Sequence, residues 1–160
     1  MKRFKDILCV VDPLTACETL LERATVLAQN NQANLSVVSV APFTAHPPPG
    51  MGLGAQATDD PVTALVQEQG RRLEAMVAPY RDRRDLDTKV LAGIPFLEIV
   101  RQVLRGRHDL VLKAPEAPGW LGRLLGSDDM HLLRKCPCPV WLIKCQAGQP
   151  FRRILATVDV

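Results

Sequence analysis

The chain alternates short apolar runs with longer segments whose apolar residues recur every three or four positions. A short apolar run is typical of a strand buried on both faces, whereas an amphipathic segment predicts a helix. Strands are expected at 7–11, 35–40, 88–91, 110–112 and 140–143. Alternating strands and helices call for a parallel sheet covered on both sides, with right-handed crossovers. We therefore predict an α/β fold: a three-layer α/β/α sandwich with a five-stranded parallel sheet.

Capping and breaking residues mark the ends of the expected helices. Thr15 and Glu18 form a capping-box pattern, which predicts the start of the first helix. Pro95 suits the first turn of a later helix, and Gly106 suits its end. Ser127 is expected to cap the last helix, because a serine oxygen accepts hydrogen bonds from the free N–H groups at a helix start.

Apolar residues at helical spacing indicate which side of each helix packs on the sheet. A long helix is expected across 62–77. In the next helix Leu97, Val100, Val103 and Leu104 are expected to point inward, and in the last helix Met130 and Leu133 are expected on one face. The segment 43–61 holds four prolines and three glycines without periodicity, so we expect a loop there.

Length and composition restrict the class of protein. With 160 residues, 47% of them hydrophobic and 23% charged, the chain has the size and balance of one globular domain. Its net charge of +3 is too small to indicate binding to nucleic acid or to an anionic membrane. No run approaches the roughly 18 apolar residues of a membrane span, so we expect a cytoplasmic protein.

The chain has five cysteines, which are Cys9, Cys17, Cys136, Cys138 and Cys145. Their odd number and their spacing do not match a disulfide framework, so all five are expected to be free, packed thiols. The Cys136-Pro-Cys138 segment has the wrong spacing for the usual zinc loop, and no fourth ligand is recognisable. We therefore expect no metal site.

One segment of the chain is repeated. Phe4–Asp12 recurs as Phe151–Asp159, with Phe, Ile, Leu, Val and Asp in the same register. Coincidence between two strand-like runs is the alternative explanation. We expect instead one domain at 1–146, followed at 147–160 by a linker and the first strand of a truncated second domain of the same kind.

Several segments together carry a family pattern. They are the opening run Ile7–Asp12, the V-x-x-G-x-P-x-x-x-I segment Val90–Ile99, the pair Gly126-Ser127 and the closing Cys136–Val140. This combination resembles the universal stress protein family of the A type, and most of all the N-terminal half of its tandem E-type members. The resemblance covers the whole chain and implies the adenine-nucleotide α-hydrolase-like form of the Rossmann-like fold.

The resemblance also implies where a ligand binds. In such folds the ligand lies beyond the carboxyl ends of the strands, at the switch in strand order. Asp12 and the Val40 backbone would contact the adenosine end of that ligand. A structural role for Asp12 is the alternative, because an aspartate after a buried strand often caps the following turn.

The phosphate end of the implied site departs from the family pattern. ATP-binding members carry G-x2-G-x9-G-S/T, in which the glycines and the helix-start amides hold the phosphates. With Gly126 and Ser127 as the final pair, Lys113 and Glu116 stand where the first two glycines belong. The Asp128-Asp129 pair lies in the first turn of the next helix, where it satisfies the helix dipole and would repel a triphosphate.

Two cationic side chains affect the repulsion between the aspartates and a triphosphate. Lys113 and Arg123 could offset it, or could pair with Glu116 and the aspartates. We expect weak or absent ATP binding, and no cofactor beyond a weakly held adenine nucleotide. The candidate ligand-binding residues are Asp12, Val40, Lys113, Arg123, Gly126 and Ser127.

The function expected from these residues is a non-catalytic, cytoplasmic stress-response module with a degenerate nucleotide cleft, acting through ligand sensing or protein contacts. His46, His108 and His131 have no adjacent nucleophile, so we do not expect an enzyme. One alternative is an ATP-binding protein with slow hydrolysis. A second alternative is a scaffold for a twin domain.

Proteins of the resembling family pair through their last strand. Here that strand consists of Val140, Trp141, Leu142 and Ile143, which would form an exposed apolar edge if left alone. We expect a homodimer through this strand, and in a longer chain a second domain that covers it. Nucleic acid and membranes are not expected as partners.

Overall fold

The computed structural model describes residues 4–15, 17–42, 61–81, 86–115 and 127–145. The strands are β1 (Asp6–Val10), β2 (Asn34–Pro42), β3 (Asp87–Gly93), β4 (Leu110–Lys113) and β5 (Val140–Leu142). The helices are α1 (Glu18–Asn31), α2 (Pro61–Arg81), α3 (Pro95–Gly106) and α5 (Asp128–Lys135). Every strand and helix expected from the sequence is present, in the expected order. The expected loop at 43–61, apart from Pro61, and the segment 147–160 lie outside the described residues.

The strands form one five-stranded sheet in the order β3-β2-β1-β4-β5. All the strand pairs are parallel, as predicted. The chain moves outward from β1 to β2 and β3, and then returns to the other side of β1 with β4. The switch in strand order therefore lies between β1 and β4, which is where ligands bind in folds of this class.

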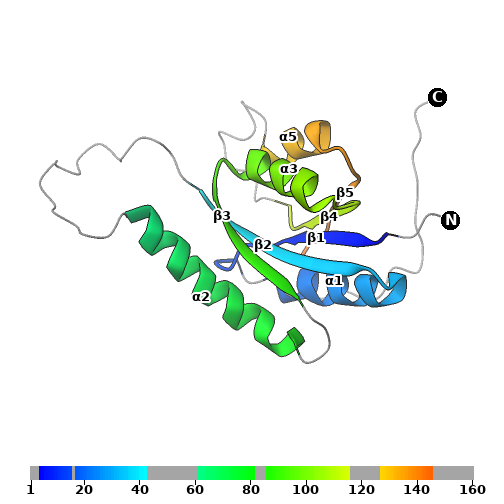
Figure 1. Cartoon of the computed structure of the whole chain (residues 1–160), viewed down its shortest axis with the longest axis horizontal. Helices are drawn as coiled ribbons and strands as arrows, with labels where there is room; N and C mark the ends of the chain where they lie inside the picture. The colour runs from blue at the N-terminus through cyan, green and yellow to red at the C-terminus, as the bar shows by residue number, and fades with distance from the viewer. Residues whose placement is uncertain (1–3, 16, 43–60, 82–85, 116–126, 146–160) are drawn as a thin grey trace, which may run out of the picture.

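Two apolar cores fill the space between the sheet and its helices. Ile7 and Cys9 of β1 belong to the core shared with α1 and α2. Leu8 and Val10 belong to the core shared with α3 and α5. Figure 1 shows the same arrangement, with α1 and α2 on one side of the sheet and α3 and α5 on the other. The apolar run of β1 is continuous because both of its faces are buried.

The start of α1 differs from the expected capping box. The helix begins at Glu18, and Cys17 occupies the N-cap position without a side-chain hydrogen bond to the helix. Thr15 lies before the helix, in a turn where its backbone N–H donates to the carbonyl of Asp12 at 3.2 Å. The capping-box prediction is wrong because Asp12 and Pro13 start a turn that includes Thr15.

The predicted ends of α3 and the predicted start of α5 are confirmed. Pro95 is the first residue of α3 and Gly106 the last, and Arg107 terminates the helix in the left-handed region at φ 52. A Cβ at Gly106 would lie 2.3 Å from Nε2 of His108, so this position has no room for a side chain. The Ser127 Oγ accepts a hydrogen bond from the backbone N–H of Met130 at 3.3 Å.

The predicted inward face of α3 is confirmed at Val103, which is 2% exposed, but is wrong at Leu104, and the predicted apolar face of α5 is wrong. Leu104 is 62% exposed, Met130 43% and Leu133 45%. In α5 the buried residues are Asp129 and Leu132, each one position before the two expected apolar residues. One position corresponds to about 100° around a helix, so this offset turns Met130 and Leu133 toward solvent. No helix in the described part of the chain is long and apolar enough to cross a membrane.

Candidate functional site

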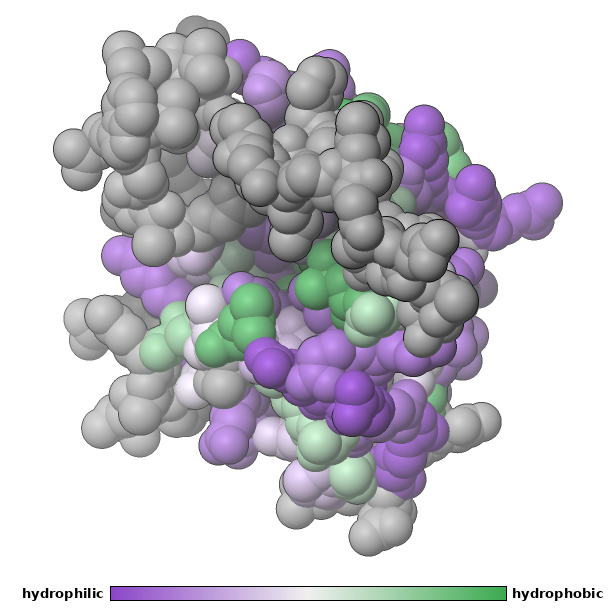
Figure 2. All heavy atoms as spheres, turned by 90° about the vertical axis from the view of Figure 1, so that its left-hand side faces the viewer, coloured by the Kyte–Doolittle hydropathy of each residue, from purple (hydrophilic) through white to green (hydrophobic). Residues whose placement is uncertain are grey.

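Four of the candidate residues lie at or near the carboxyl ends of the strands. Asp12 follows β1, Val40 lies in the last part of β2, Lys113 is the last residue of β4, and Ser127 caps α5. Figure 2 looks onto this edge of the sheet, where hydrophilic and hydrophobic residues of the described part lie side by side. Arg123 and Gly126 fall outside the described residues, so their predicted roles stay predictions.

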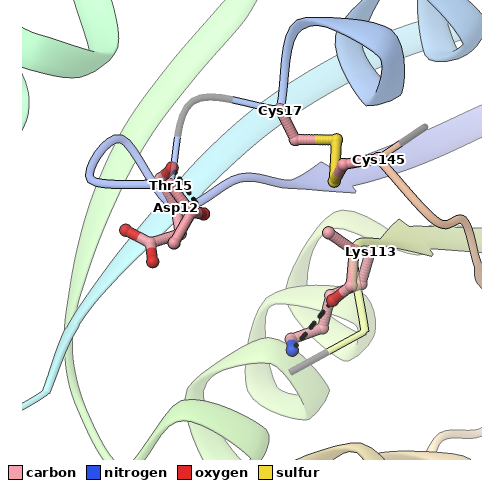
Figure 3. The surroundings of a disulfide bond; sticks show 6 residues. Asp12, Thr15, Cys17, Lys113 and Cys145 are labelled. Carbon is pink, nitrogen blue, oxygen red and sulfur yellow. Dashed lines mark hydrogen bonds between the residues drawn. A yellow bond between two sulfur atoms is a disulfide. The ribbon is translucent and has the colours of Figure 1, made fainter. Parts of the chain in front are cut away.

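The side chain of Asp12 stabilises the turn that follows β1. Its Oδ1 accepts a hydrogen bond from the backbone N–H of Leu14 at 2.9 Å. The Asp12 side chain is nevertheless exposed, and Figure 3 shows its carboxylate pointing away from the neighbouring disulfide. The turn therefore uses one carboxylate oxygen, and the geometry is compatible with both roles considered from the sequence.

Lys113 at the end of β4 and Asp129 in the first turn of α5 form a buried ion pair. The Lys113 Nζ lies 2.7 Å from Oδ1 of Asp129, and the two side chains are only 11% and 9% exposed. The same ammonium donates to the carbonyl of Ala114 at 3.3 Å. In the described part of the chain Lys113 pairs with an aspartate, one of the two kinds of partner considered from the sequence, whereas Glu116 lies outside the described residues. A charge pair removed from water in this way is costly to separate.

Protein groups already neutralise the N-terminus of α5. Ser127 caps the helix, and both acidic residues of the first turn, Asp128 and Asp129, lie where the helix dipole favours negative charge. A stacking contact between His131 and Phe96 of α3 helps hold the helix in place, with ring centroids 5.0 Å apart. In related sites a helix start of this kind attracts phosphate, but here two carboxylates of the chain are present instead.

Residues 3–144 match the sequence profile of the universal stress protein family. The chain belongs to the universal stress protein family. It is 31% identical to universal stress protein E of Photorhabdus laumondii over 169 residues, which cover 100% of this chain and 52% of that protein. The chain thus spans about half the length of this curated relative.

Solved structures of other universal stress proteins have the same fold. A universal stress protein in complex with cAMP superimposes with a TM-score of 0.60 at 18% identity, covering 91% of this chain and 100% of that one. The Archaeoglobus fulgidus protein in complex with dAMP also gives 0.60, at 20% identity, covering 89% and 100%. These likenesses confirm the predicted Rossmann-like α/β fold of this universal stress protein domain.

A disulfide joins Cys17 to Cys145, which corrects the prediction that all five thiols are free. The two residues are 128 positions apart, and their Cα atoms lie 5.4 Å from each other. Figure 3 shows the bond between the start of α1 and the segment after β5, beside Asp12 and Lys113. Sequence spacing alone could not reveal this pair, because only the packing of α1 beneath the sheet brings the two cysteines together.

The other cysteines are free thiols, as predicted. Cys9 is fully buried in β1, and burial raises the pKa of its thiol to about 12. Cys136 and Cys138 lie with their sulfur atoms 3.6 Å apart. Burial and the neighbouring Cys136 raise the pKa of Cys138 to about 12 as well. Among the described residues, no cluster of three or more His, Cys, Asp or Glu side chains could hold a metal ion.

One buried polar contact near this edge was not anticipated from the sequence. The Ser39 hydroxyl of β2 donates to Oε1 of Gln69 in α2 at 3.0 Å, and both residues are buried. Gln69 lies in the apolar stripe of α2. A glutamine within an apolar stripe is the sequence signal that could have revealed a buried polar contact here. The contact fixes α2 against the strand that carries Val40, since a buried amide needs a partner.

Proposed function

We propose that this universal stress protein domain is a non-catalytic stress-response module of the cytoplasm, with a nucleotide cleft that has lost its triphosphate end. It acts through ligand sensing or through protein contacts. The observation that carries the proposal is the buried ion pair between Lys113 and Asp129, at the position where the family's phosphate-binding segment begins. The adenosine end of the cleft, around Asp12 and Val40, is proposed to remain.

The ion pair opposes a triphosphate in two ways. The Lys113 ammonium is already neutralised by Asp129 at 2.7 Å, so it offers a phosphate little net attraction. A phosphate that took Lys113 away from Asp129 would leave this carboxylate buried without that cation, and breaking a buried pair costs about 3–5 kcal/mol. Asp128 and Asp129 also place negative charge at the helix start where the phosphates would lie.

A monophosphate is a better candidate for this cleft than a triphosphate. The structural relatives described above include complexes with cAMP and dAMP, each of which has a single phosphate. A single phosphate carries less charge toward the aspartates of α5, and the adenosine moiety supplies apolar contact area. We therefore propose weak binding of AMP through Asp12 and the Val40 backbone, with Ser127 near the phosphate.

Calorimetric titration with AMP and with Mg-ATP tests the proposal. We expect measurable AMP binding, and no ATP binding tighter than a Kd of about 10 μM, equivalent to about 7 kcal/mol. Tighter ATP binding would contradict the proposal, and phosphate release from that ATP would favour the alternative of slow hydrolysis. If neither nucleotide binds, the proposed adenosine site is contradicted. That result would favour the alternative in which the domain is a scaffold for a twin domain.

The proposed partner surface is the edge strand β5. In the described sheet β5 pairs with β4 only, so its other edge is free to pair with another strand. Trp141 is 43% exposed there, and its ring lies against Phe4 with centroids 5.7 Å apart. A second copy of the chain, or a second domain in a longer chain, is proposed to cover this edge.

A further inference from the structure

We propose that Cys17 and Cys145 are a reversible redox site that exchanges with a small disulfide of the glutathione type. The oxidised form ties the turn that carries Asp12 to the segment leaving β5. The exchange reaction is independent of the proposed nucleotide function, whereas its effect on adenine binding rests on that function.

The disulfide connects two parts of the fold that the sheet itself does not join. Cys17 lies just after the Asp12 turn, and Cys145 follows β5, so the bond spans β4, which lies between β1 and β5. The segment after β5 is held to β4 by the backbone N–H of Ile143, which donates to the carbonyl of Lys113 at 2.8 Å. The bond therefore fixes the Asp12 turn to the strand that ends in Lys113 (Figure 3).

The two cysteine residues differ in exposure to solvent. Cys17 is 7% exposed and packs in the core formed with α1, whereas Cys145 is exposed. An incoming thiol or disulfide therefore reaches Cys145 first. Cys17 occupies the N-cap position of α1, where the free N–H groups and the helix dipole stabilise a thiolate. This arrangement makes Cys145 the attacking cysteine and Cys17 the resolving one.

The exchange balances in two steps. The Cys145 thiolate attacks one sulfur of oxidised glutathione, which forms a mixed disulfide on Cys145 and releases one glutathione thiolate. The Cys17 thiolate then attacks the Cys145 sulfur, which closes the protein disulfide and releases the second glutathione thiolate. The two protons lost by the cysteines are taken up by the two glutathione thiolates. Two electrons pass from the protein to the small disulfide, and reduction is the reverse sequence.

The remaining cysteines do not compete for this reaction. Cys9 is buried among apolar residues, and its raised pKa keeps the thiol protonated. Cys136 and Cys138 remain free thiols although their sulfur atoms are only 3.6 Å apart. A thiol must ionise to attack a disulfide, so the raised pKa values of Cys9 and Cys138 make these two buried or half-buried thiols poor competitors.

Without the disulfide, the Asp12 turn depends on short-range contacts. Its backbone is held by the N–H of Leu14 on Oδ1 of Asp12 at 2.9 Å and by the N–H of Thr15 on the Asp12 carbonyl at 3.2 Å. Reduction removes the covalent link between the start of α1 and the segment after β5. We expect about tenfold weaker AMP binding in the reduced form, because reordering a single backbone residue costs about that factor.

Equilibration of the whole chain in buffers of varied glutathione ratio, followed by acid quenching, alkylation in denaturant and mass spectrometry, tests the exchange. We expect one transition, in which Cys17 and Cys145 are protected together while Cys136 and Cys138 are alkylated at every ratio. Cys17→Ser should collect glutathione on Cys145, and the matched variant Cys145→Ser should leave the buried Cys17 unmodified. Equal glutathionylation of Cys17 in Cys145→Ser would overturn the assignment of roles. A disulfide that no glutathione ratio reduces in the folded protein would overturn reversibility.

Hydrogen exchange separates this proposal from the nucleotide proposal. On reduction, the amides of Leu14 and Thr15 should exchange at least several times faster, while amides in the centre of β1 should not change. Unchanged exchange at Leu14 and Thr15 would overturn the coupling of the redox site to the turn, whatever AMP does. Faster exchange together with no AMP binding in either redox state would support the redox site and contradict the proposed function alone.

Discussion

The Lys113 ammonium at the end of β4 and the Asp129 carboxylate in the first turn of α5 lie 2.7 Å apart, with both side chains largely buried. The pair joins a strand end to a helix start. In the proposed function this lysine stands at the position of the first phosphate-loop glycine, and Asp129 balances its charge from within the protein.

Removing one member of this pair is expected to destabilise the fold. Lys113→Met leaves the Asp129 carboxylate buried without its cation, so we expect a loss of about 3–5 kcal/mol in the free energy of unfolding. The double variant Lys113→Met/Asp129→Leu removes both charges and should recover most of that loss. Urea unfolding of the single and double variants measures the difference. A double variant that is as unstable as the sum of the single ones would contradict a coupled pair.

Stability is also expected to fall in mildly acidic solution because of His108. Both imidazole nitrogens are buried, and burial lowers the pKa of His108 below 6.5, opposed in part by the carboxylate and backbone of Asp6 and by the carboxylates of Asp109 and Asp87. Between the two pKa values the unfolded chain binds more protons than the folded one. The contribution of neutral His108 to the free energy of unfolding is therefore fully present above about pH 6.5, and it is lost as the pH falls toward the lower pKa of the folded state.

A variant without the imidazole isolates this effect. His108→Gln should lose the dependence between pH 6.5 and the onset of carboxylate titration, as measured by thermal unfolding across that range. An identical pH dependence in the variant would assign the effect to another group.

The exposed indole of β5 is expected to contribute to association. Trp141→Asp places a charge on the free edge of the sheet, and a charge on an edge strand opposes strand pairing. We expect the variant to be monomeric at concentrations where the unchanged chain is dimeric, as measured by light scattering. Leu104→Asp is a matched control, because Leu104 is an exposed apolar residue of a helix, α3, and not of the edge strand. A monomeric unchanged chain would contradict the proposed homodimer.

Loss of the disulfide is expected to lower stability without removing the fold. The bond closes a loop across 128 positions, and loops of this size stabilise by about 2–5 kcal/mol through the entropy of the unfolded chain. Cys17→Ser and the reduced protein should therefore unfold at lower urea concentration, by similar amounts. Retained far-ultraviolet circular dichroism checks that the fold is intact. A reduced protein as stable as the oxidised one would contradict a closed disulfide in solution.

Much of the fold could be predicted because its signals are local. The apolar run of β1 indicates burial on both faces, and Pro95 and Gly106 mark the two ends of α3. Parallel pairing follows from the alternation of strands and helices, and the carboxyl ends of the strands then define one edge. These features depend on neighbouring residues and on general rules of connection.

The rest of the site depends on packing across long distances in the chain. Nothing near Cys17 indicates that Cys145 lies beside it. Several acids near Lys113 in sequence could have paired with it, and only the position of α5 selects Asp129. The inward face of α5 was misjudged because the buried Asp129 takes part in it, whereas a pattern of apolar residues assigns carboxylates to the surface.

The most direct test of the central claim is a calorimetric titration of Mg-ATP into the unchanged chain and into Asp129→Asn. The variant keeps the shape of the side chain and frees the charge of Lys113, so we expect about tenfold or greater gain in ATP affinity, equivalent to about 1.4 kcal/mol. Asp128→Asn is the matched control, because it removes the same charge from the same helix turn and leaves the ion pair of Lys113 in place. A larger gain in Asp129→Asn than in Asp128→Asn is the predicted result, because both variants remove a negative charge but only Asp129→Asn breaks the ion pair. Equal affinities in all three proteins, or tight ATP binding by the unchanged chain, would contradict the claim that this ion pair closes the phosphate site.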